Sequence, residues 1–466
     1  MSIPASTGLS SPSGFAYSRE QFRQYVDDAL AFARSLGASD AAAEVSEGVG
    51  LSVSVRKGEV ENVERNRDKS MGVTVYVGQR RGNANTSDFS RAAMEQTVRA
   101  AHDIARFTAE DPAAGLPDAE DMALGDTALR DLDLFHPWAI DAEAAMQIAL
   151  RCESAALAVD RRITNSEGAG VSAQQSHFYA GNTRGFGGGY ASSRHSLSVA
   201  PIASTPARGG DDMQRDAWYT SMRSAGDLSA PEAVGRYASE RALSRLKSRK
   251  IKTCEVPVLF ESTIAAGLLG AYVQATSGGA LYRKSTFLLD SLGRQVLPEH
   301  IDIHEDPHLP RGKGSAPFDD EGVRTRARDV VKAGVVQGYF LSTYSARKLG
   351  LRTTGHAGGS QNLALTSRLT AAGDNLEAML KKLNRGLFVI ELMGQGVNYV
   401  TGDYSRGAAG FWVENGRLQY PVHEITIAGN LRDMLKGITA VGADAYTMGS
   451  KTIGSVLIDR MKIAGS

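Results

Sequence analysis

Residues 304–308 read HEDPH and have the most specific chemical spacing in this chain. His304 and His308 flank a glutamate in the H-E-x-x-H pattern of zinc peptidases. In that pattern the two histidines lie one helical turn apart and hold one zinc ion, while the glutamate activates a bound water. This chemistry therefore requires a continuous helix through all five residues.

Pro307 lies inside the motif and disfavours such a helix. Proline lacks a backbone N–H and disfavours helical geometry at the preceding residue, here Asp306. Ile301 and Ile303 alternate with polar residues, which indicates a short strand. Residues 307–318, PHLPRGKGSAPF, are typical of a loop. We therefore interpret HEDPH as an extended segment that runs into a loop, with histidines that face solvent.

Polar stretches elsewhere supply candidate substrate-binding residues. His356 stands in the glycine-flanked sequence LRTTGHAGG, where backbone can approach a ligand closely. Asp403, Tyr404 and Arg406 stand between glycines in TGDYSRG, and His423 begins the alternating sequence HEITIAGN. No specific Ser–His–Asp arrangement can be assembled from the sequence. We therefore predict no catalytic residue in this chain.

Composition excludes several classes of protein. The 466 residues contain 52 basic and 52 acidic side chains, and this neutrality disfavours binding to nucleic acid or to an anionic membrane. Two cysteines, Cys152 and Cys254, are too few for a disulfide scaffold, so we expect a reduced, cytoplasmic protein. Residues 1–17 lack the pattern of a signal peptide, and we expect a disordered tail there. No apolar stretch is long enough to span a membrane.

The pattern of helices and strands indicates an α+β protein. Ser18 and Gln21 form a candidate capping box before an amphipathic helix, and Asn415-Gly416 is typical of a type I′ hairpin turn. A basic run near residues 248–252 marks the main boundary. The expected regions are an N-terminal α/β unit (18–110), a central α/β unit (111–250) and a C-terminal sheet-rich domain (251–466).

Long, ordered stretches from about residue 50 onward resemble the TldD/PmbA family, and its PmbA (TldE) branch most. They include DLDLFHP, YRKSTFLLDSLG, PFDDEGVRT, TGHAGG, ELMGQGV and TGDYSRGAAGFWVENG. The resemblance covers nearly all the chain. It implies a two-lobed fold, with an N-terminal lobe of sheets and flanking helices and a sheet-dominated, barrel-like C-terminal lobe.

The resemblance also implies a function. Members of the PmbA branch pair with a TldD-like subunit in a heteromeric metallopeptidase that cleaves small or unfolded peptides, and a link to DNA gyrase is attached to the family. The expected partners are thus a TldD-like subunit and a peptide substrate. A chain that reserves one face for a partner is also expected to form a homodimer when it is alone.

TldD-like members carry zinc on H-E-x-x-x-H at the start of a helix, followed by GLxG. When that follow-on is matched to residues 267–270, Glu261 and Ala266 take the places of the histidines, and Ser262 takes the place of the glutamate. One carboxylate is not a zinc site, and serine cannot replace a carboxylate as general base. Residues 450–458, SKTIGSVLI, also lack the family's late cysteine ligand. We therefore expect no metal or cofactor in this chain and zinc in its partner.

Two other functions stay open on the sequence alone. The chain could be a stand-alone metallopeptidase with an unrecognised site that uses Glu261, His356 or His423. It could also be a non-catalytic peptide-binding or regulatory protein. Bound zinc and activity in the isolated chain would distinguish the first, and tight peptide binding without a partner would distinguish the second.

Overall fold

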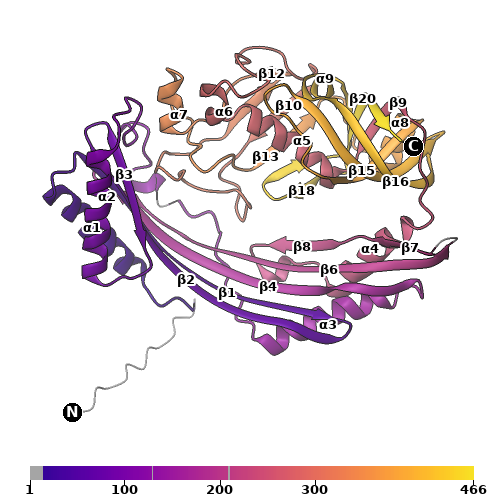
Figure 1. Cartoon of the computed structure of the whole chain (residues 1–466), viewed down its shortest axis with the longest axis horizontal. Helices are drawn as coiled ribbons and strands as arrows, with labels where there is room; N and C mark the ends of the chain where they lie inside the picture. Colours follow the sequence, from indigo (N-terminus) through magenta and orange to yellow (C-terminus); the bar gives the residue numbers. More distant parts are fainter. Residues whose placement is uncertain (1–13, 129, 208–209, 466) are drawn as a thin grey trace. The chain divides into compact units, whose positions relative to one another are not determined.

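A computed structural model describes residues 14–128, 130–207 and 210–465 (Figure 1). The first 13 residues of the expected tail lie outside this described part. The backbone N–H groups of Ala16 and Tyr17 donate to the buried carboxylate of Glu47 at 2.9 and 3.2 Å, which ties them to the fold. Contacts divide the chain into two compact units, one of Met1–Pro201 with Asp216–Ser239 and one of Ile202–Arg215 with Glu240–Ser466.

A long sheet has the strand order β3-β2-β1-β4-β6-β7, in which β5 pairs with β4 and β8 pairs with β6. Most of this sheet belongs to the first unit, whereas β7 and the end of β6 belong to the second. The strands are β1 (Asp40–Arg56), β2 (Glu59–Val77), β3 (Arg80–Thr86), β4 (Ile163–Asn182), β5 (Gly187–Gly188), β6 (Ala191–Ala207), β7 (Gly210–Arg215) and β8 (Trp218–Met222). The helices are α1 (Arg19–Ser35), α2 (Arg91–Phe107), α3 (Ala142–Leu157) and α4 (Pro231–Ser244), with short 3₁₀ turns at Gly125–Thr127 and Ala225–Asp227. The expected capping box of Ser18 and Gln21 opens α1.

Strand β1 contributes residues to two hydrophobic clusters. Alternate residues of a strand face the same side, so both clusters lie on one face of the strand. Ala41, Ala43 and Val45 pack with residues of α1 and α2. Further along the same strand, Leu51 and Val53 pack with residues of α3 and α4. Figure 1 shows α1 and α2 at one end of the long strands and α3 toward the other.

The second unit contains a closed barrel of five strands. Its order is β16-β15-β14-β9-β20, and β20 closes it by pairing with β16. The strands are β9 (Cys254–Phe260), β14 (Gly386–Met393), β15 (Asp403–Glu414), β16 (Arg417–Asn430) and β20 (Val456–Ala464). The α+β class and the barrel expected for the C-terminal lobe are therefore confirmed.

A second sheet in this unit has the order β12-β11-β10-β13-β19-β18. Its strands are β10 (Ile301–Glu305), β11 (Arg328–Lys332), β12 (Val335–Val336), β13 (Leu363–Ser367), β18 (Tyr446–Met448) and β19 (Lys451–Ile453), while β17 (Ile438–Val441) joins the barrel strand β20. The helices are α5 (Ser262–Ala275), α6 (Gly278–Tyr282), α7 (Thr343–Lys348), α8 (Leu376–Leu383) and α9 (Leu431–Lys436).

Helix α5 packs with both sheets of the second unit. Leu269 and Tyr272 of this helix belong to one buried cluster with Val258 of the barrel and Ile303 of the second sheet. Adjacent residues of the barrel strand β9 face opposite ways, so Leu259 packs instead with α8. Within the described residues, no helix combines the length and the apolar character needed to cross a membrane.

The β15–β16 hairpin turns at Asn415-Gly416, where both residues have positive φ (52° and 67°), as a type I′ turn requires. A Cβ added at Gly416 would lie 2.8 Å from Cα of Lys381 in α8. Gly449, in the β18–β19 hairpin, also has positive φ (60°), but an added Cβ there meets nothing within 4 Å. Gly449→Ala is thus a matched control for Gly416→Ala.

We expect Gly449→Ala to lower the free energy of unfolding by about 1 kcal/mol through backbone strain. Gly416→Ala should cost roughly 1–3 kcal/mol more, because α8 must move away from the added methyl. Urea unfolding followed by tryptophan fluorescence measures both. Equal effects of the two substitutions would show that α8 does not press on this turn.

Candidate functional site

The HEDPH segment does not form a zinc site. Residues Ile301–Glu305 are strand β10, as the alternation predicted. His304 is 52% exposed, and its Nδ1 lies 3.0 Å from Oδ1 of Asp329. The ring Nε2 of His308 lies instead 3.1 Å from Oγ1 of Thr325. The two histidines therefore contact different partners. His304 faces solvent as expected, whereas His308 is half-buried, and Glu305 between them points into the protein.

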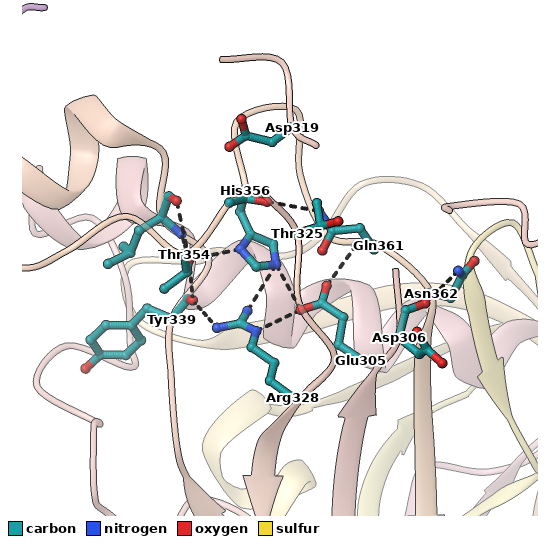
Figure 2. Close-up of polar contacts among 12 residues, drawn as sticks. Glu305, Asp306, Asp319, Thr325, Arg328, Tyr339, Thr354, His356, Gln361 and Asn362 are labelled. Atoms are coloured by element: carbon teal, nitrogen blue, oxygen red, sulfur yellow. Dashed lines mark hydrogen bonds and ion pairs between the residues drawn. The ribbon is translucent and has the colours of Figure 1, made fainter. Parts of the chain in front are cut away.

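Glu305 lies at the centre of a buried polar cluster (Figure 2). Its Oε2 accepts hydrogen bonds from Nε of Arg328 at 2.9 Å and from Nε2 of His356 at 2.8 Å. Its Oε1 accepts the backbone N–H of Gln361 at 2.8 Å. The side chains of Glu305 and His356 are 0% and 1% exposed. Both oxygens of a fully buried carboxylate are thus hydrogen-bonded, which offsets the cost of its burial.

The charges in this cluster balance if His356 is neutral. Burial lowers the pKa of His356, and the hydrogen bond to Glu305 opposes this shift only in part. Burial by itself raises the pKa of Glu305, but His356 and Arg328 outweigh it and hold that pKa below its ordinary value. Nη2 of Arg328 also lies 3.2 Å from Nε2 of His356, which disfavours a second positive charge there. The cluster therefore joins one arginine cation to one carboxylate.

The cluster also fixes the loops around it. Nη1 of Arg328 donates to the carbonyl of Tyr339 at 2.8 Å, and Nδ1 of His356 lies 2.9 Å from Oγ1 of Thr354. Asp319 accepts the backbone N–H of Ala357 at 2.9 Å, and burial raises the pKa of Asp319 to about 7. His356 thus lies in a loop, as its glycines indicated, but its ring is buried and fully engaged. This placement does not favour the substrate-binding role that we predicted for it.

Helix α5 carries the positions that we matched by resemblance to the metal motif of TldD-like proteins, and Glu261 is its N-cap residue. Oε1 of Glu261 accepts a hydrogen bond from Nη1 of Arg241 at 2.7 Å, and the two side chains are 13% and 12% exposed. Its Oε2 accepts the hydroxyl of Thr263 at 2.7 Å. Both oxygens of the one carboxylate in the motif are therefore already used.

The remaining motif positions offer no metal ligand either. Ser262 and Ala266 are buried and lie one turn apart on one helix face. One turn further, beside Gly270, lies the side chain of Lys451, whose pKa is lowered by burial. Zinc is bound by imidazole, thiolate or free carboxylate groups. The side chains here are an ion-paired carboxylate, a hydroxyl, a methyl group and an ammonium (Glu261, Ser262, Ala266 and Lys451), and they do not fit a zinc ion. Among the described residues, no three His, Cys, Asp or Glu side chains are grouped to hold a metal.

The opposite face of α5 borders a cavity of about 100 Å³. The helix contributes four lining residues at i, i+3, i+4 and i+7, and strands β14 and β15 with the segment between them contribute the others. The lining residues are Ile264, Gly267, Leu268, Ala271, Leu392, Gln395, Val397, Tyr399, Tyr404 and Arg406. The lining of the cavity is therefore mixed: α5 supplies apolar side chains, and the β14–β15 side supplies the polar ones.

Tyr404 and Arg406 are the two predicted site residues that the structure brings together. Both stand between glycines in the sequence, and the structure places them on strand β15. Alternation on the strand turns both toward the cavity and turns Asp403 away. Asp403 instead accepts the hydroxyl of Thr401 at 2.7 Å. His423 lies on β16 and does not line the cavity.

Several residues of these sites were not identified from the sequence. No sequence pattern identifies Arg328 as a site residue, because only the fold brings it to Glu305. Gln395 and Tyr399 lie in the irregular segment after β14, where no periodicity exists. The sequence does indicate that Glu305 is buried, because it continues the alternation of Ile301 and Ile303 on the buried face of the strand.

Comparison with protein families matches three successive parts of the chain. Residues 41–105 match the PmbA/TldA metallopeptidase domain 1, residues 135–246 the central domain, and residues 253–465 the C-terminal domain of the same group. Metalloprotease PmbA of Escherichia coli O157:H7 is 51% identical over 96% of this chain and 97% of its own length. The homologue of Haemophilus influenzae is 46% identical over 96% and 97%.

Solved structures agree with these sequence matches. A structure from Bacteroides thetaiotaomicron, whose description refers to DNA gyrase, superposes with a TM-score of 0.89 at 26% identity and covers 96% of this chain and all of its own. TldE from Thermococcus kodakarensis superposes with a TM-score of 0.78 over 95% of this chain and all of its own, and at 18% identity it supports the fold alone.

The two faces of β10 allow a matched test of the buried cluster. Glu305→Gln leaves the Arg328 guanidinium without its anion, and we expect it to lower the free energy of unfolding by about 3–5 kcal/mol. Asp329→Asn, on the neighbouring strand β11, removes the exposed partner of His304 and should cost less than about 1 kcal/mol. Urea unfolding measures both. A Glu305→Gln variant as stable as Asp329→Asn would contradict the structural role of the cluster.

His356 should make the protein sensitive to acid. Its pKa is lowered in the fold, so the unfolded chain takes up the proton first, and the stability from the neutral ring is complete above about pH 6.5. This stability is lost as the pH falls below that value. His356→Gln should therefore reduce proton uptake on unfolding by up to about one proton below pH 6.5.

Unfolding free energies at several pH values between 5 and 8, for the wild type and His356→Gln, give this difference. Asp319 is present in both proteins, so its own opposite pH dependence largely cancels. Parallel curves for the two proteins would mean that His356 keeps an ordinary pKa in the fold.

Proposed function

Because the chain belongs to the PmbA/TldD metallopeptidase family, we propose that it is the PmbA (TldE) subunit of a heteromeric peptidase whose zinc is carried by a TldD-type partner. The complex would cleave small or unfolded peptides. This chain would complete the peptide-binding surface and contribute no metal ligand.

The observation that carries this proposal is the state of Glu261 at the start of α5. It is the one metal-motif position that keeps a possible ligand, and its carboxylate is bound by Arg241 and Thr263. A metal ion there would have to displace an arginine and would find Ser262 and Ala266 where further ligands are needed. The family's helix is therefore retained without its metal chemistry.

The same observation disfavours a stand-alone metallopeptidase. The other residues considered for that function were His356 and His423. His356 is buried against Glu305, and His423 lies on a different strand from the residues that line the cavity. A partner that supplies the metal explains how a chain with these residues belongs to a peptidase family.

The proposal is tested by purifying the chain alone, a TldD-type protein from the same cell alone, and the two together. We expect the isolated chain to hold no stoichiometric zinc and to leave an unfolded fluorogenic peptide intact. The pair should bind about one zinc ion and cleave the peptide. Metal analysis by mass spectrometry and fluorescence assays give the two readouts.

Variants assign the zinc to one subunit. Glu261→Gln in this chain should leave the zinc content of the pair unchanged, whereas alanine at the first histidine of the partner's motif should abolish it. Zinc and peptide cleavage in the isolated chain would overturn the proposal. A homodimer of the isolated chain would not, because an unpaired partner face can pair with itself.

A further inference from the structure

Arg406 differs from three other arginines packed inside the second unit because it has no carboxylate partner among the described residues. Arg241, Arg245 and Arg328 are bound by the carboxylates of Glu261, Glu391 and Glu305, respectively. Arg406 forms no ion pair with any described residue. Its Nε is buried without a hydrogen-bond partner, its Nη2 lies 3.5 Å from the carbonyl of Leu392, and its guanidinium also interacts with the hydroxyl of the neutral Tyr404. A guanidinium is always charged, so this cation lacks a counter-charge within the described structure.

The surroundings of Arg406 are suited to an anion with an apolar body. The guanidinium lines the cavity of about 100 Å³ beside α5, whose other walls include Ile264, Leu268, Leu392 and Val397. No acidic side chain lines it. One water needs about 10–15 Å³ of such space, so the cavity has room for several non-hydrogen atoms.

Neutral polar groups beside Arg406 add hydrogen-bonding capacity. Tyr404 is 5% exposed and lines the same cavity, together with Tyr399 and Gln395. Burial raises the pKa of Tyr404 to about 12, and its hydroxyl therefore stays a donor at neutral pH. Arginine supplies two parallel N–H groups that match the two oxygens of a carboxylate. The neutral polar groups line the same cavity as the charge of Arg406.

From this arrangement we propose that the cavity between α5 and β15 binds the carboxylate of a peptide through Arg406, with the apolar part of the same residue against Ile264 and Leu268. This inference rests on the proposed peptide substrate and adds a recognition group for it. The carboxylate belongs either to the C-terminus of the peptide or to an acidic side chain, and the two sources are separable by experiment.

The cavity offers two variants that act on different properties. Arg406→Gln removes the charge and keeps much of the side-chain volume. A Cβ added at Gly267 meets nothing within 4 Å, so Gly267→Leu fills the cavity and leaves Arg406 in place. Leucine also favours a helix more than glycine does, so this variant should not unfold α5. Arg417→Gln, an exposed arginine on β16, is the control for loss of a positive charge.

Binding is measured by fluorescence polarisation with the full chain, using a dye-labelled unstructured heptapeptide that ends in leucine. The peptide is compared as the free acid, as the C-terminal amide, and as an amide with an internal glutamate. We expect one carboxylate-bearing form to bind about tenfold more tightly than the plain amide. Preference for the free acid assigns the C-terminus, and preference for the glutamate peptide assigns a side chain.

Arg406→Gln should reduce this preference to less than about twofold, and Arg417→Gln should keep it. Gly267→Leu should weaken binding of every form by at least about tenfold, with unchanged circular dichroism. Equal binding of all three peptide forms by the wild type, or an unchanged carboxylate preference in Arg406→Gln, would overturn the inference.

Hydrolysis by the pair is measured separately from binding. Cleavage by the pair without a carboxylate preference in this chain would refute the cavity's role and leave the proposed function intact. A carboxylate preference that Arg406→Gln abolishes, together with a pair that cleaves no peptide, would support the cavity and refute the peptidase function.

Discussion

The organisation of the second unit depends on the buried carboxylate of Glu305. Removing a carboxylate from water costs several kcal/mol unless each oxygen finds donors. Those donors come from β11, through Arg328, and from the loop that carries His356 and Gln361. Three segments far apart in sequence are thus held together at one point. None of them can move alone without exposing or unpairing a charge.

Helix α5 is held in place by packing and by an ion pair at its start. At its start, Glu261 is neutralised by Arg241, and Ser262 and Ala266 are simply buried. The helix still packs with both sheets, and its opposite face borders a cavity. Packing constrains the side-chain volumes on a helix, whereas catalysis constrains their donor atoms. A helix can therefore meet the packing requirement without supplying the donor atoms that catalysis needs.

Local signals in the sequence were informative wherever the physical cause was local. Asn415-Gly416 predicted its hairpin because both residues tolerate positive φ, and Pro307 excluded a helix through HEDPH. The partners of Glu305 could not be predicted in this way. They lie 23 to 56 positions away in sequence, and strand pairing and loop packing bring them together. Tyr404 and Arg406 were chosen from their glycine-rich context, but only the strand explains why they share one cavity.

The closure of the barrel imposes an order on biosynthesis. Strand β9 pairs with β20, which is about 200 positions later in the chain, and at roughly 5–20 residues per second the ribosome needs about 10–40 seconds to reach it. Until β14 is made, β9 lacks both of its neighbours, and from then until β20 is made it presents one open edge. Open apolar edges recruit other strands, and chaperones protect such nascent segments. The cell therefore has to shield the half-made unit until its synthesis has passed β20.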